Sequence, residues 1–138
     1  MPSDLSPLLQ ALALPALATL LALAVYFVTA MLVGRARVAH QVKAPSIHGP
    51  EAFERVLRVQ QNTLEQLAFF LPSLWMAALF NNPRLAAALG FVWVGGRIAY
   101  AVGYTRSASQ RAPGFVIGVF TSVVLFALAL TGVIDQLS

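Results

Sequence analysis

Four stretches of the chain are long and apolar enough to cross a lipid bilayer, and they restrict the fold more than any other feature. A helix crosses the hydrocarbon core of about 30 Å in about 20 residues. Backbone polar groups in lipid must find partners within their own segment, so apolar runs of this length and continuity are helices. The runs cover residues 5–34, 66–80, 85–104 and 112–134, and an amphipathic segment at 50–65 leads into the second.

The composition agrees with a chain embedded in lipid. Hydrophobic residues make up 59% of the sequence and charged residues only 10%, whereas a soluble domain carries about 25% charged residues. The isoelectric point near 10.4 would suggest nucleic-acid binding only if the basic residues formed a soluble face. They flank the apolar runs instead, so we expect membrane lipids and no nucleic acid as partners. We predict one all-α domain, an integral membrane four-helix bundle with helices at about 5–34, 50–80, 83–105 and 113–135.

Residues typical of helix starts stand where these helices begin. Proline is tolerated at the first helical position because the N–H group there has no partner anyway. Asparagine is a favoured N-cap, and Asn82 is expected to cap the third helix. The prolines at the predicted starts are Pro50, Pro83 and Pro113.

The basic residues also predict the orientation of the chain. Lys and Arg are enriched in short cytosolic loops. Seven basic residues lie in or beside two connections, the one between the first and second predicted helices and the one between the third and fourth. Arg84 lies on the opposite side. We therefore expect both connections in the cytosol and both termini on the other side. The seven residues are Arg35, Arg37, Lys43, Arg55, Arg58, Arg106 and Arg111.

Two stripes of polar residues run along the predicted second and third helices. Their spacings of i, i+4, i+7 and i, i+3, i+7 each put three side chains on one helix face. Ionisable residues at membrane depth are costly and usually face a bundle interior or a wet cavity. The stripes are Arg58, Asn62 and Glu65 on the second helix and Arg97, Tyr100 and Tyr104 on the third, with Arg111 seven residues further on.

These stripes allow two interpretations. In the structural one, Arg58 and Glu65 form a buried pair, and Tyr100 and Tyr104 are aromatic residues of the membrane interface. In the functional one, the stripes line a polar pocket that opens to the cytosol and holds a small, multiply charged zwitterion. Arginine offers a permanently charged fork for carboxylates, and a glutamate accepts hydrogen bonds from an ammonium group. A second substrate would then arrive from the lipid.

Two motifs resemble those of a known family. Residues 53–65, FERVLRVQQNTLE, resemble the helix 2 signature F-E-R-V-x-R-x-x-x-N-x-x-E of the MAPEG family, the membrane-associated proteins in eicosanoid and glutathione metabolism. Residues 97–104, RIAYAVGY, are similar to its helix 3 motif R-x-x-Y-x-x-G-Y, which a downstream arginine follows. The segments 34–37 and 45–49 look like the branch of microsomal glutathione transferase type 2 and leukotriene C synthase. The resemblance covers nearly the whole chain.

The resemblance implies a homotrimer with three active sites between neighbouring subunits near the cytosolic face. Glutathione is the implied co-substrate, with no metal, and its thiol attacks a lipophilic electrophile or a peroxide. Arg111 matches the arginine that stabilises the thiolate. The implied glutathione-binding residues are Arg58, Asn62, Glu65, Tyr100 and Tyr104 from one subunit, with Arg37 and Gln60 from the adjacent one.

The implied function is a membrane-bound glutathione S-transferase with glutathione peroxidase as a further activity. Three departures favour general detoxification over leukotriene synthesis: Gln66 replaces a tyrosine, Val38 replaces a basic residue, and the fourth helix has no tryptophan. One alternative is a non-catalytic lipid-binding member of the same family. Another is a small proton-coupled exporter that uses Glu65 as its membrane carboxylate, although such exporters carry their glutamate in the first helix, which has no charge here.

Overall fold

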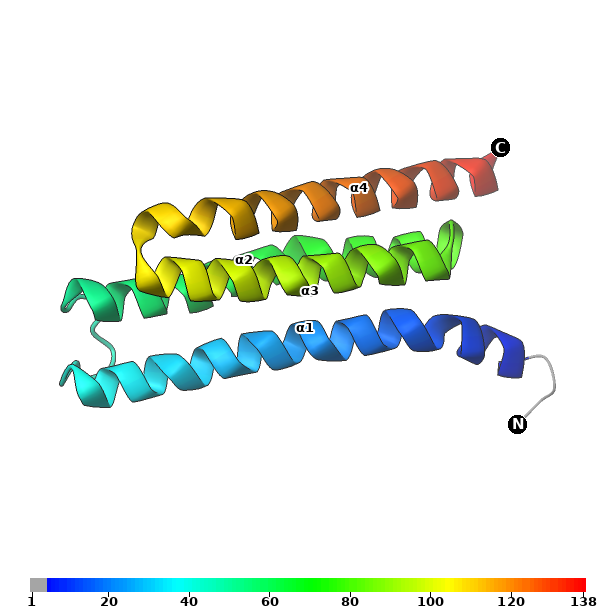
Figure 1. The fold of residues 1–138 in the computed structure, drawn as a ribbon. Coiled ribbons are helices and arrows are strands. Elements are labelled where there is room, and N and C mark those ends of the chain that lie inside the picture. The colour runs from blue at the N-terminus through cyan, green and yellow to red at the C-terminus, as the bar shows by residue number, and fades with distance from the viewer. Residues whose placement is uncertain (1–4) are drawn as a thin grey trace.

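A computed structural model describes residues 5–138 and shows a bundle of four long helices that run alternately up and down (Figure 1). Helices α2 and α3 lie in the middle, with α1 packed against one side of this pair and α4 against the other (Figure 1). Each helix is long and apolar enough to cross a membrane, which confirms the predicted all-α membrane fold. The helices are α1 (Leu5–Ala39), α2 (Glu51–Phe80), α3 (Pro83–Arg106) and α4 (Ala112–Leu137), and the short 3₁₀ helix η1 (Ala108–Arg111) precedes α4.

The two ends of the bundle differ in character. The start of α1, the end of α4 and the turn between α2 and α3 lie at one end (Figure 1). The connections 40–50 and 107–111 lie at the other (Figure 1), which we call the basic end because most of the Arg and Lys residues flank these connections. The up-down topology therefore brings the amphipathic start of α2, the last turns of α3 and the start of α4 to one depth.

A side-chain cap marks the start of α3, whereas hydropathy places the end of α1 too early. The Asn82 side chain accepts hydrogen bonds from the backbone N–H groups of Arg84 and Leu85, each at 3.0 Å, so the predicted N-cap of α3 is confirmed. Helix α1 continues past the predicted end at 34 to Ala39. Charged residues mark where an apolar run leaves the hydrocarbon, but they do not break the backbone hydrogen-bond ladder.

All four helices contribute to one apolar core. The rings of Phe70 and Trp93 stack with their centroids 4.0 Å apart and their planes 5° apart, which joins α2 to α3. Ala18 and Ala22 bring α1 close to this pair, and Leu125 enters from α4. Small residues at such contacts are typical of membrane bundles, where packing rather than hydrophobic exclusion holds the helices together.

Helices α3 and α4 approach most closely near the basic end. A Cβ atom on Gly114 would overlap the backbone nitrogen of Tyr100, and one on Gly103 would overlap the carbonyl oxygen of Gln110. Gly118, by contrast, has ordinary spacing, since its nearest neighbour would be the Arg97 Cδ atom at 3.6 Å. Gly114 and Gly118 are spaced as a G-x-x-x-G motif, and the close crossing depends on the first of the two. This crossing places the start of α4 directly beside the polar stripe of α3.

Candidate functional site

A pocket of about 550 Å³ lies between α2, α3 and the start of α4 near the basic end. This volume is within the usual range of small-molecule sites, about 300–1,000 Å³. Both predicted stripes contribute to its lining, as does the residue that precedes α4. The lining consists of Arg58, Asn62, Glu65, Tyr100, Arg111, Ala112, Phe115 and Val116.

Local structure explains why these side chains meet. Successive turns of α2 carry Arg58, Asn62 and Glu65, because residues spaced four and then three apart share one helix face. Arg111 ends η1 and immediately precedes α4, so the close α3–α4 crossing sets its position. The next turn of α4 adds Phe115, whose ring centroid lies 6.4 Å from that of Tyr100. The pocket therefore has a charged wall and an apolar wall side by side.

The structural interpretation of the stripes is wrong in its two specific predictions. Within residues 5–138, no salt bridge joins Arg58 to Glu65, and both side chains are exposed on the bundle. Tyr100 and Tyr104 are only 3% and 9% exposed, so they pack inside the protein and are not interface aromatics. A polar pocket that lies open on the side of the bundle is the interpretation that fits this geometry.

Arg97 belongs to the predicted polar stripe of the third helix, but it does not line the pocket as the functional interpretation of the stripes expected. It is completely buried, and its Nη2 atom donates to Asn62 Oδ1 at 3.1 Å and to Thr63 Oγ1 at 2.9 Å. Its guanidinium carbon lies 4.1 Å from the ring centroid of Tyr100. The available signal was its position as the one charge in an otherwise uncharged span.

Tyr104 lies behind the pocket rather than in its lining. Its hydroxyl accepts a hydrogen bond from Arg111 Nη1 at 3.4 Å, and the Arg111 guanidinium carbon lies 5.3 Å from the tyrosine ring centroid. The structure therefore places this predicted site residue where it supports Arg111, one step away from the cavity.

Arg37 and Gln60 lie outside the pocket of their own chain. Arg37 Nη1 donates to the carbonyl oxygen of Ser46 at 2.8 Å, in the connection between α1 and α2. Gln60 faces α1, and its Nε2 atom donates to the Tyr26 hydroxyl at 3.1 Å. Their predicted contribution to a site in an adjacent subunit stays a prediction.

The charges that face the pocket indicate what it can hold. Arg58 and Arg111 supply two cations, Glu65 supplies one anion, and Asn62 and Tyr100 supply neutral hydrogen-bonding groups. This set is complementary to a small ligand with two anionic groups and one ammonium group. No cluster of three or more His, Asp or Glu side chains is placed to hold a metal ion in the part of the chain that the structure describes.

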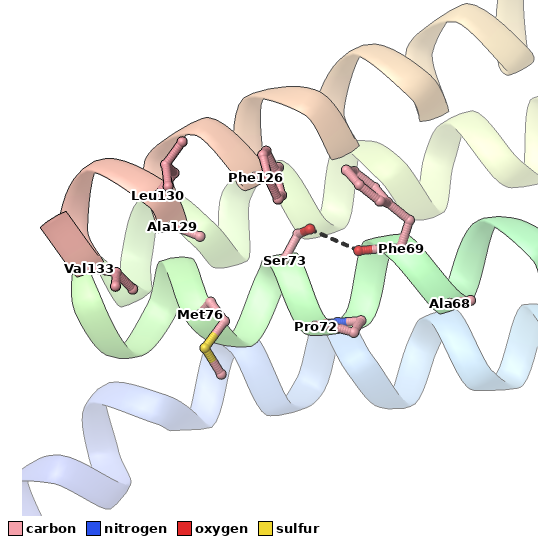
Figure 2. Close-up of a pocket in the computed structure, with 9 residues that line it drawn as sticks. All are labelled: Ala68, Phe69, Pro72, Ser73, Met76, Phe126, Ala129, Leu130 and Val133. Atoms are coloured by element: carbon pink, nitrogen blue, oxygen red, sulfur yellow. Dashed lines mark hydrogen bonds between the residues drawn. The ribbon is translucent and has the colours of Figure 1, made fainter.

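A second cavity, of about 320 Å³, lies between α2 and α4 and is quite different in character (Figure 2). Pro72 and Met76 of α2 and Phe126 and Leu130 of α4 are among its lining residues, none of which is charged. Its hydroxyl group, on Ser73, donates to the backbone oxygen of Phe69 at 2.8 Å (Figure 2). This cavity therefore has no free polar group with which to orient a charged ligand.

Four helices able to span a membrane, with a charged pocket near one end, define an integral membrane protein with a candidate binding pocket on the side of its bundle. The chain belongs to the MAPEG family, whose sequence model matches residues 15–131. It is 52% identical over 123 residues to an uncharacterized protein of Synechocystis sp., covering 89% of this chain and 90% of that protein. It is 39% identical over 104 residues to microsomal glutathione S-transferase 2 of Mus musculus, covering 75% and 71% of the two chains. Leukotriene C4 synthase of Cavia porcellus is 38% identical over 122 residues, covering 88% and 81%.

Proposed function

We propose that this protein is a membrane-bound glutathione S-transferase that conjugates the thiolate of glutathione to lipophilic electrophiles. The observation that carries the proposal is the convergence of five predicted glutathione-binding or catalytic residues on one pocket: Arg58, Asn62, Glu65, Tyr100 and Arg111. Relatives named for glutathione transfer and leukotriene C4 synthesis support the same reaction class.

Glutathione carries two carboxylates, one ammonium and one thiol, and the pocket of one chain offers partners for one carboxylate, the ammonium, the peptide groups and the thiol. Arg58 provides a guanidinium for a carboxylate, and Glu65 accepts from the ammonium. Asn62 and Tyr100 provide hydrogen bonds to the peptide groups. The tripeptide is thereby held in a bent conformation with its thiol near Arg111.

Arg111 is assigned the catalytic role of stabilising the thiolate. A thiol of pKa about 8.5 is only about 3% ionised at pH 7. Lowering that pKa by about 2 makes the thiolate the major form, which requires about 2.7 kcal/mol of differential stabilisation. One guanidinium in a partly desolvated pocket is sufficient for this. The thiolate sulfur then attacks the electrophilic carbon, forms the carbon–sulfur bond and displaces the leaving group with its electron pair.

The lipophilic substrate is proposed to lie against the apolar wall that Phe115 and Val116 form on α4. Both side chains are exposed on the bundle surface, where a compound dissolved in the bilayer reaches them from the side. A lipid hydroperoxide at the same place would be reduced to the alcohol as one glutathione forms a sulfenic acid, which a second glutathione converts to the disulfide and water.

We further propose that the working unit is a homotrimer with its basic end in the cytosol, where it meets glutathione. Arg58 and Glu65 are exposed on the side of the bundle, and charged groups are costly where they face lipid. An adjacent subunit that covers the pocket would remove this cost. In that arrangement Arg37 and Gln60 would come from the neighbouring subunit.

The proposal is tested with the purified protein in detergent micelles or nanodiscs. We expect calorimetry to detect glutathione binding, and mass spectrometry to detect the conjugate of glutathione with a hydrophobic halide or epoxide. Cysteine alone serves as the control thiol: it should not bind, and the protein should not accelerate its conjugation above the uncatalysed rate. Failure to bind glutathione contradicts the proposal, whereas binding without turnover supports the non-catalytic alternative.

A further inference from the structure

We infer that Arg97 is a positioning residue that fixes the side-chain amide of Asn62, so that the site presents an N–H donor to its ligand beside Glu65. The inference rests on the proposed function, because it assigns a role within the glutathione site. Arg97 itself is completely buried and does not line the pocket. It therefore acts through its neighbours.

The hydrogen bonds define the orientation of the Asn62 amide. Arg97 Nη2 can only donate, and it donates to the Oδ1 atom of Asn62 at 3.1 Å. The amide nitrogen is thereby turned toward Glu65 and donates to its Oε2 atom at 3.4 Å. An amide has two N–H groups, so one of them stays available for a carbonyl or carboxylate of the ligand.

The opposite orientation of the amide would be unfavourable in the presence of Arg97. The Oδ1 atom of Asn62 would face the Glu65 carboxylate, and the NH₂ group would face the guanidinium, which leaves both pairs mismatched. Without Arg97 this penalty falls, since only the contact with Glu65 would distinguish the two orientations. Arg97 therefore decides whether the pocket presents a donor or an acceptor at this position.

Arg97 is itself held in place by contacts on several sides. Its second acceptor is Thr63 Oγ1 at 2.9 Å, and its guanidinium carbon lies 4.1 Å from the Tyr100 ring centroid and 5.9 Å from that of Trp93. No carboxylate forms a salt bridge with it within residues 5–138. A buried charge without an ion-pair partner is a poor source of stability, which favours a role in the site.

The first test replaces Arg97 with methionine, which keeps an unbranched apolar stem and removes the N–H donors. We expect the Kd for glutathione to rise about tenfold while kcat at saturating glutathione changes less than about threefold, because Arg111 and Tyr104 are untouched. Arg97→Lys retains one donor and should recover most of the affinity. Thr63→Val, the matched control, removes the other acceptor of the same nitrogen and should change Kd less than twofold.

The second test is Asn62→Asp, which stays informative even where an Arg97 variant does not fold. The aspartate keeps an acceptor for Arg97 but presents a second carboxylate beside Glu65. We expect thermal stability to be equal to or greater than that of the parent, with a Kd for glutathione at least tenfold higher. In an Asn62→Ala background, Arg97→Met should have less than a twofold further effect on Kd.

The outcomes separate this inference from the proposed function. A parent protein that binds no glutathione contradicts both. A parent that binds and conjugates glutathione, together with an Arg97→Met variant of parental Kd, overturns the inference alone. Equal Kd values for Asn62→Asp and the parent overturn it as well, as do additive effects of the Arg97 and Asn62 substitutions.

Discussion

The guanidinium of Arg111 lies over the ring of Tyr104, 5.3 Å from its centroid, and donates a hydrogen bond to its hydroxyl at 3.4 Å. Arg111 precedes α4, whereas Tyr104 belongs to the last turn of α3. The contact thus holds the end of a long, flexible side chain at the edge of the pocket. A guanidinium held in this way can stabilise a developing negative charge without first reorganising.

Arg111→Ala is expected to abolish the thiolate signal of bound glutathione and to lower the conjugation rate about a hundredfold, the usual effect of removing one preorganised charge-stabilising group. The ultraviolet absorbance of the thiolate on mixing protein with glutathione measures the first effect. Arg106→Ala, at the exposed end of α3, is the control and should leave both quantities within twofold of the parent. A parental conjugation rate in Arg111→Ala would show that the assigned role is wrong.

Glu65→Gln is expected to weaken glutathione binding about tenfold, because the neutral amide no longer pairs with the ammonium group of the ligand. The matched ligand is a glutathione analogue that lacks the amino group, and its affinity should change less than twofold. Calorimetric titration of both ligands against both proteins completes the comparison. An equal loss of affinity for the two ligands would show that Glu65 does not bind the ammonium group.

We expect two variants, Arg37→Ala and Arg111→Ala, each to have low activity when expressed alone. Co-expressed in equal amounts, they should regain roughly a quarter of parental activity, because in a cyclic oligomer that fraction of interfaces pairs two intact halves. Conjugation assays on the co-purified mixture measure this recovery. Activity no higher than that of the separate variants would contradict a site shared between subunits.

Gly114→Ala is expected to destabilise the protein by about 1–3 kcal/mol, the usual cost of overpacking, because the new Cβ would overlap the backbone of Tyr100. Gly95→Ala is the control from the same helix pair, since a Cβ there has no neighbour within 4 Å. It should be neutral or stabilising, by up to about 1 kcal/mol, through helix propensity. Thermal unfolding in detergent compares the two, and equal midpoints would argue against the close α3–α4 crossing.

Asn82→Ala is expected to cost about 1 kcal/mol by leaving the first N–H groups of α3 without their side-chain acceptor. Asn82→Asp keeps an acceptor at the same position and should retain most of the stability. The thermal midpoints of the two variants, measured under one detergent condition, give the difference. No difference between alanine and aspartate would mean that the cap contributes nothing in the intact bundle.

The proposed site residues of one helix could be predicted from the sequence, because helical spacing alone puts Arg58, Asn62 and Glu65 on one face. Arg97 shows the limit of that reasoning. Its spacing places it on the same stripe as Tyr100, but spacing does not distinguish a side chain that enters a pocket from one that lies beneath it. That distinction depends on how deeply α3 is packed between α2 and α4.

The four helices were determined by the sequence, in which long apolar runs alternate with short polar segments. In lipid, the backbone of such a run satisfies its hydrogen bonds by forming a helix. Only the tertiary structure decided which polar groups meet. Gly114 lets α4 approach the backbone of α3 closely enough to carry Arg111 to Tyr104 and the pocket, while Gln60 turns toward Tyr26 on α1. Such pairings depend on contacts between residues far apart in the chain, which local periodicity does not specify.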